Sequence, residues 1–145
     1  MKPDGSSMSC IFCRIVAGEI PAEVVARGPD AVAFLDLQPL ADGHTLVVPH
    51  AHAATIEGLD AAAFDNLFHL VRRLADPVRR AVGGVGTTVG VNNGEASGQT
   101  VPHVHVHIVP RWPNDGAGSV HTIFPRRTSR TLADVGAAIR AAAGT

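Results

Sequence analysis

The chain has 145 residues, of which 46% are hydrophobic and 17% charged, the composition of a globular domain with one core. Its 12 Lys and Arg against 13 Asp and Glu give a formal net charge of −1, which indicates neither nucleic acid nor an anionic membrane as a partner. Because no apolar run reaches the ~20 residues of a transmembrane helix and no signal-peptide pattern opens the chain, we expect a cytoplasmic protein.

The first third of the chain predicts a tail, a short helix and three strands. Residues 1–9 are polar, with Pro, Gly and Ser, and are expected to be disordered. Apolar residues after Cys10 favour a short helix, which Gly18 and Pro21 would end. The turn residues Gly28-Pro29-Asp30 separate two apolar runs and predict a hairpin. The strands expected here are 22–27, 31–37 and 45–48.

A long helix is predicted after Asp60, a favourable N-cap residue. Pro77 would break a straight helix, or would start a second short helix with Asp76 as its cap. Gly83-Gly84 ends the segment. Apolar residues recur on one helical face at Phe64, Leu67, Phe68, Val71, Leu74, Ala75, Val78 and Val82.

The remaining segments complete an α+β fold. Strands are expected at 87–91 and 101–109, with loops at 93–98 and 111–119 and an alanine-rich helix at 132–143. The chain shows no internal repeat and no second domain. The prediction is a mostly antiparallel sheet of about five strands with one main helix packed on it.

Three histidines alternate along the last predicted strand. Since side chains alternate across a strand, His103, His105 and His107 should share one face, with neighbours roughly 6.5 Å apart, and the intervening apolar residues should face the core. Three imidazoles in a row behind a glycine-rich loop are hard to explain as packing. Neutral imidazole is a good nucleophile near pH 7, and a neighbouring imidazole can stabilise phosphate charge or protonate a leaving group.

The two cysteines, Cys10 and Cys13, stand two residues apart, a spacing that suits a metal or a redox dithiol better than a structural disulfide. A redox role would need a thioredoxin-like βαβ context, which the predicted elements do not supply. Together with two histidines the cysteines would form a closed Cys₂His₂ zinc site, which is structural rather than catalytic. Two plain buried thiols are the alternative.

The sequence resembles the histidine-triad family of nucleotide hydrolases and transferases, whose signature is His-φ-His-φ-His-φ-φ with φ apolar. The signature is complete from His103 to Val109, and the resemblance extends over about residues 10–111. Five further segments fall in family order: Cys10–Cys13, Gly18–Ala22, Ala33–Asp36, Gly43–Pro49 and Val91–Thr100.

The resemblance implies that His105 is the nucleophile and forms a nucleotidyl-histidine intermediate. It puts His107 beside the α-phosphate, and Gln99, Thr100 and Asn92 near the phosphates or the leaving group. His44 would orient a catalytic group. The residues implied to hold the ribose and a purine base are Asp36, Phe34 and Leu37.

The resemblance to the bacterial branch of the family implies a structural zinc at Cys10, Cys13, His52 and His103, with His50 as a rival of His52. It also implies a homodimer formed through the main helix and the strand before the loop. Residues 10–145 would form one domain, in which 112–145 is an extension that departs from the animal phosphoramidase branch.

Other interpretations stay open. Phe34 and Leu37 could be core residues, Asp36 a strand-end cap, Thr100 a plain strand residue, and His44 a partner of its own turn. The function that the sequence favours is release of a nucleoside monophosphate through a covalent intermediate. A nucleotide-binding scaffold with vestigial catalysis is the main alternative. A zinc hydrolase with the triad as ligands is less favoured, because it lacks a nearby carboxylate base and an open coordination position.

Overall fold

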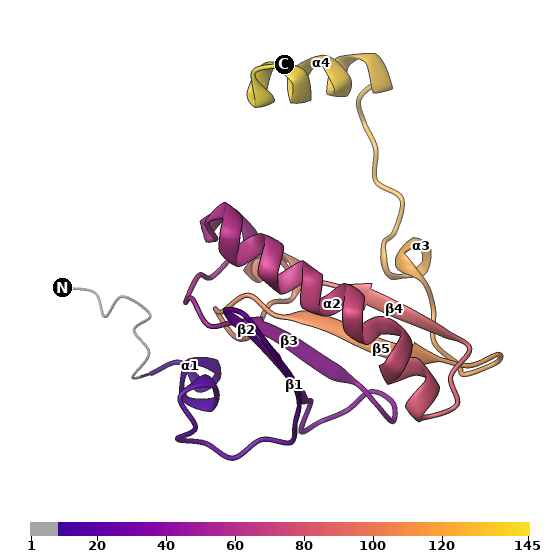
Figure 1. Ribbon diagram of the computed structural model, residues 1–145. Helices are drawn as coiled ribbons and strands as arrows, with labels where there is room; N and C mark the ends of the chain where they lie inside the picture. Colours follow the sequence, from indigo (N-terminus) through magenta and orange to yellow (C-terminus); the bar gives the residue numbers. More distant parts are fainter. Residues whose placement is uncertain (1–8) are drawn as a thin grey trace. The chain divides into compact units, whose positions relative to one another are not determined.

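The computed structural model describes residues 9–145, so the predicted tail lies outside the described residues apart from Ser9. The chain divides into two compact units, one that ends at Asp115 and one from Gly116 to Thr145 (Figure 1). The first unit holds the sheet, the long helix and all the predicted site residues.

Five strands form one sheet in which every neighbouring pair is antiparallel. The order across the sheet is β1-β2-β3-β5-β4, so the long helix that follows β3 leads to the far edge before the chain returns to the centre. The architecture is α+β, as predicted. The strands are β1 (Val24–Gly28), β2 (Ala31–Leu35), β3 (Thr45–Pro49), β4 (Gly86–Gly90) and β5 (Val106–Arg111).

The helices begin where the sequence supplies a cap. Asp60 caps the long helix by accepting the Ala63 N–H at 2.8 Å, and Thr131 caps the last helix through the Asp134 N–H. Residues 9–145 form the helices α1 (Ile11–Val16), α2 (Ala61–Ala81), α3 (Val120–Ile123) and α4 (Leu132–Ala143). Two short 3₁₀ turns, η1 (Ile56–Gly58) and η2 (Glu95–Ser97), lie in the connections.

The expectation that Pro77 would break the long helix or start a second one is wrong, because α2 runs through it to Ala81. Pro77 removes one helical N–H donor, but its φ is compatible with a helix. Leu74 and Val78, on either side of the proline, both pack on the core. Their burial holds the last turns in line with the rest of the helix.

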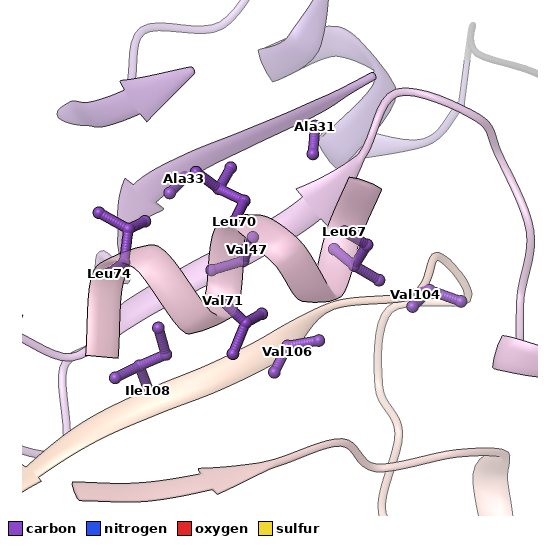
Figure 2. Packing of buried hydrophobic residues seen from close by; sticks show 10 residues of the cluster. All are labelled: Ala31, Ala33, Val47, Leu67, Leu70, Val71, Leu74, Val104, Val106 and Ile108. Atoms are coloured by element: carbon purple, nitrogen blue, oxygen red, sulfur yellow. The ribbon is translucent and has the colours of Figure 1, made fainter. Parts of the chain in front are cut away.

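Alternating side chains divide the core between the two faces of the sheet. On one face α2 covers a cluster that includes Val104, Val106 and Ile108, the residues between and after the three histidines (Figure 2). On the other face α1 covers a second cluster that includes Phe34 and Leu46. The prediction that the apolar residues between the histidines face the core is confirmed on the face that α2 covers. The histidines His105 and His107 lie on the face that α1 covers.

The last strand along the chain, β5, is shorter than predicted, since it begins at Val106 rather than Val101. Pro102 explains the difference. The His103 N–H donates to the Val101 carbonyl at 2.8 Å, which makes a three-residue turn with proline at its centre. The Val104 N–H then donates to the Ala53 carbonyl rather than to a strand partner. His103 therefore lies before the sheet, next to the residues that follow β3.

The C-terminal unit consists of α3 and α4 joined by residues 124–131, and α3 was not predicted. Helix α4 has the predicted bounds, and Gly144, the residue after it, is a C-cap in the left-handed conformation. No residue of either helix is buried within the chain, and Leu132 and Ile139 are largely exposed. Across residues 9–145, every helix is too short or too polar to span a bilayer.

Candidate active site and metal centre

A cavity of about 490 Å³ opens on the α1 side of the sheet. Two triad histidines, His105 and His107, form its polar wall together with His44 from the start of β3. The other walls are mostly apolar. They are made by Ile11, Phe12, Ile15, Ala22, Phe34, Leu37, Leu40, Leu46 and Val101, with Asp36, Gln38 and Thr100 as the remaining polar residues.

The tautomer of His105 is fixed by the backbone. Its Nδ1 lies 2.7 Å from the His103 carbonyl oxygen, and because a carbonyl can only accept, Nδ1 carries the proton. In the neutral ring the other nitrogen, Nε2, then has a free lone pair. The ring is 6% exposed and packs edge-on against Phe12 at 5.0 Å between centroids, which restrains its orientation. The middle histidine thus lines the cavity with a fixed tautomer and an unprotonated Nε2.

A chain of hydrogen bonds also fixes His107. The Leu40 N–H donates to His44 Nδ1 at 3.1 Å, so neutral His44 carries its proton on Nε2. That nitrogen lies 2.9 Å from His107 Nδ1 and donates to it. His107 must then carry its own proton on Nε2, a buried atom that has no hydrogen-bond partner among the described residues. A buried donor without a partner is costly, which points to an acceptor on a bound ligand.

Acidification is expected to destabilise the protein through His107. Burial, reinforced by His105 and His44, lowers the pKa of His107 to about 4. Unfolded histidine has a pKa near ~6.5, so between these values the unfolded state binds a proton that the folded state does not. The free energy of unfolding should therefore fall as the pH falls from ~6.5 to ~4, by on the order of 1–2 kcal/mol after allowance for partial exposure of the ring.

Urea unfolding of wild type and His107→Gln between pH 7 and pH 4 measures this contribution. The glutamine amide oxygen can still accept the proton of His44 but cannot titrate. The wild type should lose more stability than the variant over this range. Equal losses would contradict the assignment.

The three residues expected to bind the ribose and the base differ in burial, and all three line the cavity. Asp36 Oδ1 accepts the Gln38 N–H at 2.9 Å, as a strand-end cap would, while its Oδ2 lies 3.6 Å from His44 Nε2. Phe34 is buried in the core and also lines the cavity. Leu37 is 75% exposed, so it forms the rim of the cavity rather than part of the core.

The loop residues expected at the phosphates do not all reach the cavity. Thr100 lines it, whereas Asn92 is exposed and lines neither this cavity nor the smaller one described below. The Gln99 side chain holds the loop together. Its Nε2 donates to the carbonyls of Ala54 and Val101 at 2.7 and 2.9 Å, and its Oε1 accepts the Gly94 N–H at 2.7 Å. Both amide protons of Gln99 are therefore already donated to backbone oxygens.

The predicted zinc ligands meet at one point. His103 Nδ1 lies 3.4 and 3.5 Å from the sulfurs of Cys10 and Cys13 and 3.2 Å from His52 Nδ1. Cys13 Sγ lies 3.3 Å from His52 Nδ1. A tetrahedral zinc with Zn–S near 2.3 Å and Zn–N near 2.0–2.1 Å puts its ligand atoms about 3.3–3.8 Å apart. The four donors therefore fit a zinc ion, while His50 is exposed and outside the group.

The far side of His103 also suits a metal ligand. Its Nε2 lies 2.9 Å from the Pro49 carbonyl oxygen and must carry the proton, which leaves Nδ1 unprotonated toward the sulfurs. Burial lowers the pKa of His103 to about 4, so the ring is neutral at pH 7. Burial, with help from Cys10, raises the pKa of the Cys13 thiol to about 11. Zinc binding at neutral pH would therefore displace the Cys13 proton.

A second group of potential metal donors in residues 9–145, formed by Asp36, His44 and His107, does not fit a metal. A metal on His44 Nε2 would require the ring proton to move to Nδ1. That nitrogen already accepts the Leu40 N–H, and two N–H groups would then face each other. The group is a chain of hydrogen bonds, and the donor set that fits zinc among residues 9–145 includes neither His105 nor His107.

A family model for the HIT domain matches residues 17–114. The chain belongs to the HIT family. The matched residues include the triad, the loop before it and the strands β1 to β5.

Relatives and solved structures agree with this membership. The HIT chain is 41% identical over 111 residues to the adenosine 5′-monophosphoramidase of Schizosaccharomyces pombe, a match that covers 77% of this chain and 80% of the relative. A crystal structure from Streptococcus mutans UA159 has a TM-score of 0.82 at 33% identity and covers 99% of this chain and 89% of its own. A zinc-bound histidine triad family protein from Mycobacterium smegmatis has a TM-score of 0.73 at 31% identity. The match covers 92% of this chain and 99% of that protein.

Sequence reasoning missed the contribution of α1 to the cavity of this HIT chain. Phe12 lies between the two cysteines, and its ring contacts Phe34, His103 and His105 at centroid distances of 5.7, 5.8 and 5.0 Å. Ile11 and Ile15 line the same cavity. The Cys-x-x-Cys spacing carried a usable signal, because a metal shared with His103 brings the residues between the cysteines close to the triad.

Proposed function

We propose that the protein is a nucleotidyl hydrolase or transferase that attacks the α-phosphate of a purine nucleotide with His105 and releases a nucleoside monophosphate. The proposal rests on two histidine nitrogens in the same cavity wall, one with a lone pair and one that carries a proton. His105 has its Nδ1 proton held by the His103 carbonyl, and His107 has a buried Nε2–H without a partner among the described residues. One is suited to attack phosphorus and the other to hold a phosphoryl oxygen.

The reaction runs in two steps. The His105 Nε2 lone pair forms a bond to the α-phosphorus while the bond from phosphorus to the leaving-group nitrogen or oxygen breaks, and the leaving group keeps that electron pair and takes a proton from water. Water then attacks the phosphorus, loses a proton, and the P–Nε2 bond breaks so that its electrons return to His105. His107 donates to a non-bridging oxygen in both steps, which stabilises the charge that develops there.

The walls of the cavity suit a nucleoside. Phe12 and Phe34 meet edge to face and offer, with the isoleucines of α1, an apolar slot for a planar base. Asp36 can accept hydrogen bonds from ribose hydroxyls through Oδ2, because only its Oδ1 is held by the Gln38 N–H. Thr100 can offer its hydroxyl to the phosphate. No Lys or Arg is among the residues that line the cavity, so neutral hydrogen-bond donors would bind the phosphate.

Zinc is proposed at Cys10, Cys13, His52 and His103 as a structural ion. When bound it would join the N-terminal helix to the segment that precedes the nucleophile, and it would supply no open position for catalysis. Because Phe12 lies between two of the ligands and contacts the His105 ring, the ion would also hold one wall of the base slot.

A homodimer formed through α2 and β4 is proposed as well. Strand β4 lies at an edge of the sheet, with Val89 44% exposed, and Phe64 of α2 is 38% exposed. Light scattering at micromolar concentration should give about twice 15.0 kDa. Val89→Lys should shift the protein to monomer. The matched control is Val25→Lys, since Val25 is equally exposed but lies on β1 at the opposite edge. A 15.0 kDa wild-type species alone would reject the dimer.

The test of the proposed function is a substrate panel. Adenosine and guanosine phosphoramidates and dinucleoside polyphosphates are offered to the purified protein, and release of nucleoside monophosphate is followed for each. Turnover of at least one class is expected. Tight nucleotide binding with no turnover of any member would instead favour a binding protein.

A further inference from the structure

A second, smaller cavity adjoins the proposed nucleotide site. It has a volume of about 290 Å³ and lies between the segment after β3 and the loop before the triad. Thr100 lines both cavities. Because the two cavities share this residue, the second is where the leaving group of the proposed reaction would lie when the nucleotide occupies the first.

One ionisable side chain, Glu95, is among the residues that line this second cavity. Glu95 is the first residue of η2, and the loop around it is held by several hydrogen bonds. The Gly98 N–H donates to the Glu95 carbonyl at 2.9 Å, and the Ser97 hydroxyl donates to the Gly94 carbonyl at 2.7 Å. Gln99 ties the same loop to the Ala54 carbonyl. These hydrogen bonds restrain the backbone of the loop that carries the Glu95 carboxylate.

A second carboxylate, that of Glu57, is hydrogen-bonded to the same loop. Asn93, on the same loop, donates from Nδ2 to the Glu57 carboxylate at 2.8 Å and accepts the Ile56 N–H through Oδ1. Hydrogen bonds, that from the Thr55 side chain first, lower the pKa of Glu57, so it is anionic at neutral pH. Among the described residues, no Lys or Arg lines either cavity.

We propose that Glu95 selects substrates whose leaving group carries a positive charge, such as an amine with a second, protonated amino group, over neutral and anionic leaving groups. This inference rests on the proposed function and narrows it. A departing polyphosphate would bring several negative charges to a cavity that holds a carboxylate and no cation, whereas an ammonium group would be attracted there. The phosphoramidate class is thereby favoured over dinucleoside polyphosphates.

The experiment compares adenosine phosphoramidates whose leaving amines have matched length and different charge. The amines are 1,4-diaminobutane, which is cationic at its free end, pentylamine, which is neutral, and 5-aminopentanoate, which is anionic. Values of kcat/KM are measured at low salt for wild type, Glu95→Gln and Glu95→Lys. The matched control is Glu23→Gln, since Glu23 is exposed and lines neither cavity.

The wild type and Glu23→Gln should prefer the cationic over the anionic substrate by roughly 10-fold or more. Glu95→Gln should reduce the preference to within about 3-fold, and Glu95→Lys should reverse it. The rate with the neutral amine should change little, because the charge acts on the tail of the leaving group and not on the phosphorus.

Three results would overturn the inference. If turnover occurs but the preference is the same in wild type and both Glu95 variants, charge selection by Glu95 is wrong while the proposed function stands. If Glu95→Gln lowers all three rates equally, Glu95 only supports the loop. If the wild type turns over none of the substrates and no member of the wider panel, the proposed function fails and the selection fails with it.

Discussion

Replacement of His105 by alanine is expected to abolish turnover while nucleotide binding is largely retained. The imidazole provides an unprotonated nitrogen at the cavity wall, with its other nitrogen hydrogen-bonded to the His103 carbonyl. Removal of a covalent nucleophile lowers kcat by on the order of 10⁴-fold or more, because no group of similar placement can replace it. The apolar slot and Asp36 are untouched, so the Kd for a nucleoside monophosphate should change by less than about 10-fold.

The variant is to be compared with His69→Ala, which removes an exposed histidine from α2. Steady-state rates on the best substrate of the panel and calorimetric binding of the product give the two quantities. His69→Ala should match the wild type in both. A His105→Ala enzyme with a near wild-type rate would show that another group attacks the phosphorus.

Loss of zinc is expected to have the largest effect on stability. The protein purified without added metal should contain about one zinc per chain, and chelation or His52→Ala should lower the melting temperature by roughly 10–20 °C. The expectation follows because α1 has only 6 residues, and the ion would join it to His52 and His103, which lie 39 and 90 positions after Cys13. His103→Ala should be at least as damaging, because it also removes the hydrogen bond to the Pro49 carbonyl.

His50→Ala is the control for this prediction, because His50 is two residues from His52, is exposed, and lies outside the donor group. It should keep both the zinc and the melting temperature of the wild type. Zinc added back to the metal-free protein at pH 7 should release at least about one proton, that of the Cys13 thiol, whose pKa is raised to about 11 by burial. Absence of zinc, with a melting temperature that chelators do not change, would contradict the metal centre.

Much of the fold could be predicted because local signals agree with the tertiary structure. Asp60 caps the long helix as expected, and the last helix spans the predicted residues 132–143. Gly28-Pro29-Asp30 separates two strands that do pair as a hairpin. Alternation around the triad correctly assigned Val104 and Val106 to the core below α2. In each case the signal and its consequence lie within a few residues of each other.

Two prolines account for two of the differences between the predicted and the observed elements, one through distant packing and one through a local turn. Pro77 is a helix breaker by itself, but the packing of its neighbours on the core keeps α2 continuous. Pro102 delays β5 by making a turn that the apolar pattern cannot reveal. The position near the phosphates that the resemblance implies for Gln99 stays a prediction, and the sequence did not indicate that its amide donates to the carbonyls of Ala54 and Val101.

The sequence predicted which residues lie together in the site better than it predicted their hydrogen bonds. The four zinc donors and the histidines of the cavity are brought together as the motif spacing and the resemblance implied. The proton positions were not predictable, because they depend on two backbone groups, the His103 carbonyl and the Leu40 N–H. Those groups decide which nitrogen of each ring can attack, accept or donate.

The central claim, covalent catalysis by His105, is tested most directly by trapping the intermediate. Wild-type protein is mixed with an adenosine phosphoramidate, quenched within milliseconds to seconds, and its intact mass is measured, followed by peptide mapping of any adduct. A transient increase equal to one nucleoside monophosphate minus water is expected, located on His105 and absent from His105→Ala. An adduct on His103 or a cysteine, or turnover by the His105→Ala protein at near wild-type rate, would contradict the mechanism.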